Sequence, residues 1–431
     1  MGIKFTKTVL SNGLTVHLKE IHSAPLISHW IWYRVGSRDE TPGKTGISHW
    51  VEHMQFKGTE KFPSSELDKT ISREGGVWNA STSLDWTAYY EKLPSDKIDL
   101  AMELEADRMV NSVYDPEEVE SERTVIISER EGHENEPMFK LDEAIQRCAF
   151  DVHPYRYEVI GDLEDLHKIQ RDDLYQHYRN YYVPNNAVLA IAGDFDTTEM
   201  LDKVRSYYEA IPSGPSPSHP AQLEAPLAGE RKVDLKGPGE TSYLKVGYRA
   251  PAASDRDFFA FTVLDSILAG PASLNMFGGG HITNKTSRLY RSLVEKELAV
   301  AVGAGLQATF HPFIYDITVI FHAGQKPEDA LNTLDAELKR LQDSPVLEEE
   351  IARAVKQARA LFAYGSENIT NQAFWLGYAE MFADYQWFVN YVNSLEKITP
   401  EDVQRVAQVY LMPEKRVVGT YIPDQGYGGE A

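Results

Sequence analysis

The chain has 431 residues, of which 42% are hydrophobic and 25% are charged, as in an ordinary soluble globular protein. Its formal net charge of −22 disfavours nucleic acid and anionic membranes as partners and suits a neutral or basic peptide. The only cysteine, Cys148, excludes an intramolecular disulfide and a thiolate zinc site, so a bound zinc ion would need histidine and carboxylate ligands.

The first 33 residues are predicted to form three strands. Residues 5–10 and 14–18 flank a Ser-Asn-Gly turn, the signal of a β-hairpin, and residues 26–33 form a largely apolar third strand. No apolar run approaches the roughly 20 residues of a membrane span, and the N-terminal residues have no apolar signal core. We therefore expect no membrane span and a cytoplasmic location, or a periplasmic one if a leader was removed.

A possible metal site follows the polar loop 36–46, where the chain reads His49-Trp-Val-Glu52-His53. On a helix the two histidines lie one turn apart on one face, with Glu52 beside them. Two imidazoles in this arrangement can hold one zinc ion and leave the carboxylate next to it. Taken alone, the five residues are equally compatible with two surface histidines on an amphipathic helix.

A second helix, residues 65–73, precedes a stretch that is rich in Thr, Trp and Tyr, and residues 75–90 are predicted to form a strand. The small side chains near its start would leave the backbone accessible to an extended peptide by strand addition. This candidate substrate-binding stretch consists of Asn79, Ala80, Ser81 and Thr82. A plain sheet edge explains the same residues.

The next helix is predicted from Glu117 to about Gly132, because Asp115 and Pro116 form a strong helix start. Glu122 and Glu129 are seven residues apart on it, which is two turns, so their carboxylates share one face. The two residues are candidates for a metal site. A solvated acidic face is the ordinary alternative.

The chain is predicted to consist of two homologous α+β units in tandem. Residues 169–190 align without gaps with residues 398–419 at an offset of 229, and both segments combine a helix, a Tyr-x-x-Pro exit and a strand. Residues 211–220 contain four prolines and resemble an extended linker. We therefore predict an N-terminal domain 1–212, a linker 213–232, and a C-terminal domain 233–431 without the histidine motif. Each would be a mainly antiparallel sheet packed with helices.

Together these features resemble the pitrilysin/insulinase family of zinc metallopeptidases, the inverzincins, including the mitochondrial processing peptidase type. The resemblance covers nearly the whole chain. It rests on His49-x-x-Glu52-His53, Glu129 with Glu122 seven residues earlier, Asn79-Ala80-x-Thr82-Ser83, Thr87-x-Tyr89-Tyr90, Tyr182-x-Pro184-x-Asn186, and the duplicated halves.

The resemblance implies a zinc peptidase with a clam-shell arrangement of halves. His49, His53 and Glu129 would bind one Zn²⁺ and leave one position open for water. Glu52 would act as general base and acid, and Glu122 would orient one of the histidines. The stretch that begins at Asn79 would pair with the backbone of a peptide substrate.

The second half departs from the family pattern in the run from Ser287 to Val300. Active members carry an Arg and a Tyr in this run, whereas this chain has Val294 and Val300 at those positions. Valine donates no hydrogen bond, so the resemblance implies that a paralogous partner subunit supplies the Arg and Tyr in a heterodimer. A self-sufficient homodimer that uses Tyr290 or Arg291 is the alternative.

Two other functions are compatible with the histidine motif, a non-catalytic scaffold and a structural zinc site. A non-catalytic scaffold, like the core subunits of the respiratory cytochrome complex that share the fold, would tolerate degraded zinc motifs, and this motif is intact. A structural zinc site would have no use for the spare carboxylate of Glu52. The glycine-rich stretch 270–280 is a candidate flap, and a plain surface loop explains it equally well.

Overall fold

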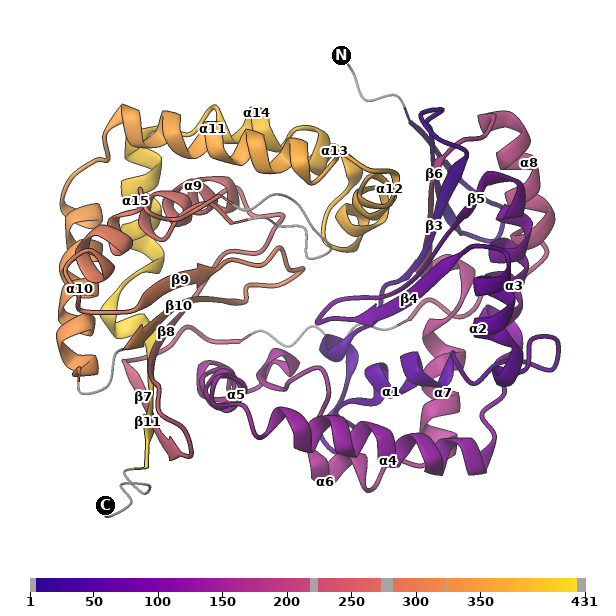
Figure 1. Cartoon of the computed structure of the whole chain (residues 1–431), viewed down its shortest axis with the longest axis horizontal. Coiled ribbons are helices and arrows are strands. Elements are labelled where there is room, and N and C mark those ends of the chain that lie inside the picture. The colour runs from indigo at the N-terminus through magenta and orange to yellow at the C-terminus, as the bar shows by residue number, and fades with distance from the viewer. Residues whose placement is uncertain (1–4, 218–223, 273–281, 322–324, 425–431) are drawn as a thin grey trace. The chain divides into compact units, whose positions relative to one another are not determined.

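The computed structural model describes residues 5–217, 224–272, 282–321 and 325–424. It contains two sheets with helices packed on them (Figure 1), which confirms the α+β class. Most of the predicted flap, residues 273–280, lies outside the described residues. Among the helices of the described ranges, none is both long and apolar enough to cross a bilayer.

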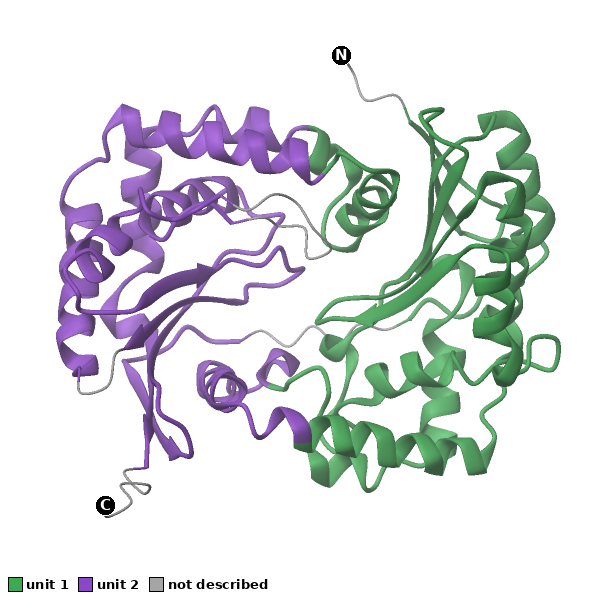
Figure 2. Ribbon diagram, in the orientation of Figure 1, with its two compact units in different colours: residues 1–131, 157–221, 366–389 green, residues 132–156, 222–365, 390–431 purple. Residues whose placement is uncertain are grey.

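The chain divides into two compact units (Figure 2). Unit 1 comprises residues 1–131, 157–221 and 366–389, and unit 2 comprises residues 132–156, 222–365 and 390–431. Each unit is built from three separate segments of the chain. The predicted domains on either side of residues 213–232 are continuous ranges, and that division stays a prediction about the two homologous halves of the sequence. Strand β7 begins at Arg231, inside the predicted linker.

The sheet of unit 1 has six strands in the order β1-β2-β6-β3-β5-β4, and only the pair β2–β6 is parallel. Its elements are β1 Thr6–Val9, β2 Thr15–Glu20, β3 Leu26–Tyr33, α1 Ile47–Met54, α2 Ser64–Arg73, β4 Val77–Thr82, β5 Thr87–Pro94, α3 Ile98–Asn111, α4 Pro116–His133 (whose last residues pass into unit 2), α6 Leu163–Leu166, α7 Arg171–Tyr181, β6 Ala187–Gly193, α8 Thr197–Tyr208, α12 Ile369–Tyr378 and α13 Tyr385–Val389. The first hairpin and the helices that carry the predicted metal ligands are therefore confirmed.

One prediction in this unit was wrong. Residues 75–90 form two antiparallel strands, β4 and β5, rather than one strand. A turn at residues 83–86 reverses the chain, and the N–H group of Ser83 donates to the carbonyl of Trp86 across it. Ser83 and Asp85 are ordinary turn residues, but the aromatic run around them hides this signal.

The sheet of unit 2 has five strands in the order β7-β11-β8-β10-β9, with a single parallel pair, β7–β11. Its elements are α5 Pro137–Ala149, β7 Arg231–Gly237, β8 Ser242–Arg249, α9 Phe258–Leu268, a π-helical turn Tyr290–Val294, β9 Ala301–Gly305, β10 Ile314–Phe321, α10 Pro327–Asp343, α11 Glu348–Tyr364, α14 Tyr391–Leu395, α15 Pro400–Tyr410 and β11 Arg416–Pro423.

The duplication predicted from the sequence is confirmed in the structure. Helix α7 and strand β6 begin at residues 171 and 187, and helix α15 and strand β11 begin at residues 400 and 416, so both differ by 229. Without its edge strand β1, the first sheet reads β2-β6-β3-β5-β4, which has the same order and directions as the five strands of the second sheet. Strand β9 therefore occupies in unit 2 the edge position that β4 has in unit 1.

Each sheet is covered on one face by a helix that comes from the other half of the sequence. Helix α12 packs on β3 and β6 of unit 1, where Phe374 lies 5.6 Å and 5.4 Å from the rings of Trp30 and Trp32. Gly377 lies so close to Trp32 that an added Cβ atom would stand 2.1 Å from its indole nitrogen.

Helix α5 packs in the same way on β7, β8 and β11 of unit 2. Two glycines in these strands, Gly247 and Gly419, make room for Ile145 of the helix, since an added Cβ atom would lie 3.0 Å and 2.8 Å from its side chain. The two halves of the chain have thus exchanged equivalent helices.

Candidate metal and active site

Helix α1 carries His49, Glu52 and His53, and its start is fixed by groups outside the helix. Gly46 precedes it with a φ angle of 84°, and an added Cβ atom there would lie 2.4 Å from the carbonyl of Ile160. Gly46 has no side chain to cap the helix, so the buried carboxylate of Glu40 accepts hydrogen bonds from the N–H groups of Gly46 and Ser48, both at 2.8 Å. Sequence reasoning missed Glu40, although a glycine at the start of a helix signals that an acceptor must come from elsewhere.

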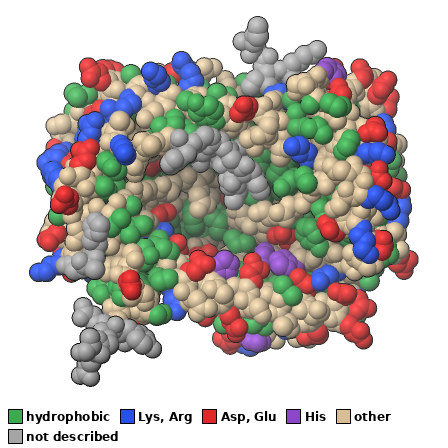
Figure 3. Space-filling view, viewed as in Figure 1, with side chains coloured by type: hydrophobic (Ala, Val, Ile, Leu, Met, Phe, Trp, Pro, Cys, Tyr) green, Lys and Arg blue, Asp and Glu red, His purple; other side chains and the backbone are tan. Residues whose placement is uncertain are grey.

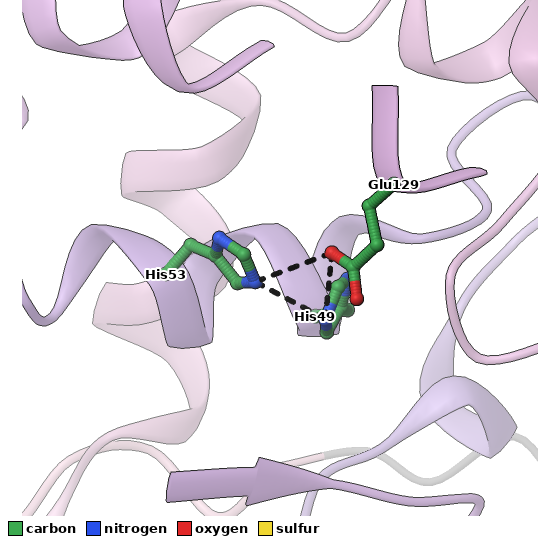
Figure 4. Close-up of side chains that lie close together, drawn as sticks. All are labelled: His49, His53 and Glu129. Carbon is green, nitrogen blue, oxygen red and sulfur yellow. Dashed lines mark hydrogen bonds and ion pairs between the residues drawn. The ribbon is translucent and has the colours of Figure 1, made fainter. Parts of the chain in front are cut away.

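Three side chains from α1 and α4 converge on one point (Figure 4). The Nε2 atoms of His49 and His53 lie 3.2 Å apart. Oε2 of Glu129 lies 3.8 Å from Nε2 of His53 and 4.0 Å from Nε2 of His49. Of the residues that the structure describes, these form the cluster of His, Cys, Asp and Glu side chains able to hold a metal ion.

The donor atoms fit a tetrahedral zinc ion. Two nitrogen ligands about 2.0–2.1 Å from zinc are separated by roughly 3.3 Å, close to the observed distance between the two imidazole nitrogens. The carboxylate of Glu129 stands slightly further away, but its side chain is 40% exposed and can move inward by rotation. Two imidazoles and one carboxylate are also the donor types that zinc takes in catalytic sites.

Glu122 lies behind His53 and is 6% exposed. Its Oε1 atom accepts a hydrogen bond from Nδ1 of His53 at 2.8 Å, which leaves the lone pair of Nε2 directed at the cluster. Its second oxygen forms an ion pair with Lys57. Burial raises the pKa of the Glu122 carboxyl, but His53 and Lys57 outweigh this effect and lower it. Nothing in the sequence pointed to Lys57.

Glu52 lies next to the cluster and takes no part in it. Its side chain is buried, and Oε2 accepts a hydrogen bond of 2.6 Å from the hydroxyl of Thr82. Burial raises the pKa of Glu52, and the bond from Thr82 and the nearby His53 act in the opposite direction. The site therefore holds a carboxylate whose affinity for a proton is increased.

The predicted substrate-binding stretch forms β4, the edge strand of the sheet. Asn79 lines a cavity of about 590 Å³ together with Glu52 and His53, and the cavity continues past Phe56 and Lys57. The side-chain oxygen of Asn79 accepts the N–H of Ala80 at 2.9 Å. Strand β4 thus borders the site along an open edge.

The visible face of the molecule is not uniformly acidic. In the space-filling view (Figure 3) acidic and basic side chains are interspersed over most of the visible face, and histidine side chains lie beside acidic ones near its lower middle. On this face the acidic side chains are therefore distributed rather than gathered at one point.

The positions expected to carry an Arg and a Tyr lie in unit 2. Val294 ends the π-helical turn, and Val300, which is 44% exposed, precedes the edge strand β9. Arg291 is exposed, while Arg288 is bound to both carboxylate oxygens of Glu350 at 2.8 Å and 2.7 Å.

Comparisons with known proteins agree with this description. Residues 15–163 match the model of the insulinase family (peptidase family M16), and residues 168–358 match the model described as the peptidase M16 inactive domain. An uncharacterized zinc protease of Streptomyces coelicolor is 28% identical over 427 residues, covering 96% of this chain and 89% of the relative. The β subunit of the mitochondrial-processing peptidase of Lentinula edodes is 25% identical, with 94% and 87% of the chains covered.

A solved structure gives the same result. The crystal structure of a protease from Helicobacter pylori has a TM-score of 0.90 and 25% identity, and the match covers 98% of this chain and all of that one. Both sequence halves and the whole fold are thus accounted for by one family, and the chain belongs to the pitrilysin/insulinase family of peptidases, family M16.

Proposed function

We propose that this chain is a zinc-dependent endopeptidase that cleaves peptides or unfolded segments. The observation that carries the proposal is the convergence of His49, His53 and Glu129 beside Glu52, a buried carboxylate that is held separately. A closed structural zinc site has no need of such a group, so Glu52 favours catalysis. The printed names of the relatives, which include zinc proteases, support the same chemistry.

Each residue of the site has a chemical task in this proposal. His49, His53 and Glu129 would hold the zinc ion, which when bound supplies Lewis-acid polarisation of a peptide carbonyl. Glu52 would take a proton from the attacking water and deliver it to the nitrogen of the leaving amine. Its raised pKa suits a group that must both accept and release a proton. Glu122 would fix the ring of His53.

The substrate would bind as an extended strand along β4. Hydrogen-bonded and non-hydrogen-bonded pairs alternate in an antiparallel ladder. Because Ser83 bonds to Trp86, Thr82 and Ala80 fall at non-hydrogen-bonded positions and direct their N–H and C=O groups to the open edge. A peptide that pairs with Ala80 would pass the cavity that Asn79 and Glu52 line.

A Glu52→Gln variant tests the proposal. The amide keeps the shape of the side chain but cannot carry a proton between water and amine, so the variant should retain one zinc ion per chain and lose turnover of a fluorogenic peptide. General acid–base catalysis typically contributes 10²–10⁴-fold, which sets the expected loss. The measurements are metal analysis and peptide cleavage.

Glu66→Gln serves as the matched control, because Glu66 is an exposed carboxylate on α2 that pairs with Lys69. It should leave zinc content and turnover unchanged. A Glu52→Gln variant with full turnover would contradict the catalytic role of this residue, and a parent chain without zinc would contradict the metal site.

We further infer that the active enzyme is a heterodimer. Val294 and Val300 stand where an Arg and a Tyr would be needed, and the loss of one oxyanion donor costs roughly 10²–10³ in rate. A paralogous partner with this pair would complete the site. The relative from Lentinula edodes, which is named as a subunit, supports this assembly. The competing assembly is a homodimer that uses Tyr290 or Arg291.

A further inference from the structure

Thr82, the last residue of β4, forms a hydrogen bond with Glu52, the proposed general base. Oγ1 of Thr82 lies 2.6 Å from Oε2 of Glu52, the distance expected for a hydroxyl that donates to an ionised carboxylate. Glu52 is 8% exposed, so little water competes for this oxygen. In such surroundings a hydrogen bond to a charged group is strong and holds its partner in one orientation.

The buried hydroxyl of Thr87 lies next to that of Thr82. Thr87, which is fully buried, pairs with Thr82 across the hairpin, and their hydroxyl oxygens lie 3.4 Å apart. Thr87 donates to the carbonyl of Val35 at 3.0 Å. Of the two oxygens near the Thr82 hydroxyl, the Glu52 carboxylate is the closer, at 2.6 Å against 3.4 Å for Thr87, and the stronger acceptor, so the Thr82 proton is directed to Glu52.

The same strand performs two tasks at neighbouring positions. Ala80 directs its backbone to the open edge, where the Asn79 side chain accepts its N–H group and would have to give way to a pairing peptide. Thr82 is partly buried, and its side chain reaches Glu52 on α1, the helix against which β4 packs. The side-chain hydroxyl of Thr82 is engaged by Glu52, whereas the role expected from the sequence concerns the strand backbone and stays a prediction.

We propose that Thr82 is a positioning residue whose hydroxyl holds Glu52 by Oε2, leaves Oε1 to take the proton and does not itself bind the peptide. This inference rests on the proposed peptidase function. It deepens that function by making the substrate strand also the support of the base. Thr82 acts through Glu52 alone, so its removal should affect the chemical step and not the affinity for the substrate.

The test compares Thr82→Val with Thr82→Ser in the full chain, together with its partner if one is needed. Valine keeps the branched shape and removes the donor, so kcat should fall roughly 10- to 100-fold, the range for a hydrogen bond to a charged group, while KM and zinc content stay unchanged. Serine keeps the donor and should restore most of kcat. Thr8→Val on β1, the opposite edge strand of the same sheet, is the matched control and should change nothing.

Two readouts do not depend on turnover. In the Glu52→Gln background, adding Thr82→Val should leave the Kd of the uncleaved peptide unchanged. A crystal structure of the metal-free Thr82→Val variant should show the Glu52 carboxylate turned away from β4.

Three results would overturn the proposal: a raised KM or Kd with an unchanged kcat, a wild-type kcat in Thr82→Val, or a carboxylate that stays in place without the hydroxyl. If the parent protein lacks peptidase activity, the proposed function fails. The Glu52 orientation in the crystal structure then still decides whether Thr82 positions it.

Discussion

At the scale of single residues, the side chains of the site are held in place by neighbouring side chains that lie outside it. His53 is held from behind by Glu122, which in turn is held by Lys57. Thr82 holds Glu52 in the same manner. The groups that would touch metal or water are therefore fixed by neighbours that would touch neither.

The first prediction at this scale concerns Glu122. A Glu122→Gln variant replaces the charged acceptor of the His53 Nδ1–H bond by a neutral one, so the imidazole becomes a weaker ligand. Zinc affinity should fall by roughly 10- to 100-fold in a chelator competition measurement. Glu118→Gln is the control, because Glu118 lies one turn earlier on α4 and touches Lys57 at 3.5 Å without reaching His53. Equal zinc affinities of the two variants would refute the role given to Glu122.

Sequence reasoning could find the residues of the site but not all of their connections. His49, Glu52 and His53 are placed by helix geometry alone, and so is the shared face of Glu122 and Glu129. Bringing the two helices together required the resemblance to a family. The hydrogen bond between Thr82 and Glu52 depends on the orientation of β4 relative to α1. The periodicity of side chains along the sequence does not predict this orientation.

At the scale of elements, the exchange of α5 and α12 is the feature that the sequence did not reveal. The pattern of an amphipathic helix shows which face is buried but not which sheet will cover it. The sequence repeat predicted two similar units correctly, yet it assigned each helix to its own half. The glycines at 247, 377 and 419 mark the close helix–sheet contacts, and only the structure shows what approaches them.

The prediction at this scale concerns the segment after α12, where Glu380 is anchored to the first two strands. Its Oε1 atom accepts from Lys7 at 2.8 Å and lies 3.2 Å from Nε2 of His17. Burial raises the pKa of Glu380, but these two partners outweigh burial and lower it to about 2. The folded pKa lies below the unfolded value of 4.5, so the stabilisation is present above pH 4.5 and is lost as the pH falls toward 2.

A Glu380→Gln variant should therefore lower the free energy of unfolding by about 1–3 kcal/mol at pH 7, and the difference from the parent should shrink between pH 4.5 and 3. Urea denaturation at several pH values measures this. Glu164→Gln, which removes an exposed partner of Lys168, should cost less than about 1 kcal/mol at every pH. A loss of stability that does not change with pH would show that Glu380 acts by packing rather than by charge.

At the scale of the whole molecule, the proposed zinc ligands and the valines at positions 294 and 300 lead to a prediction about assembly. The isolated chain should cleave a fluorogenic peptide slowly, and adding the paralogous partner purified from the native host should raise the rate by roughly 10²-fold or more. A partner with its Arg and Tyr replaced should bind the chain and give no increase.

The homodimer makes the opposite prediction. Full activity of the isolated chain, abolished by Tyr290→Phe and indifferent to the partner, would refute the heterodimer. A chain that binds zinc and a partner but never cleaves a peptide would favour the scaffold function.

The exchanged helices also set the order in which the protein can be built during synthesis. Unit 1 needs α12 to cover Trp30 and Trp32, and that helix is translated more than 300 residues after them. Until residues 366–389 have left the ribosome, one face of the first sheet exposes its indole rings. The helices that carry the proposed metal ligands are therefore made before the segment that covers their sheet. Chaperone contact with the nascent N-terminal half is the natural consequence of this arrangement.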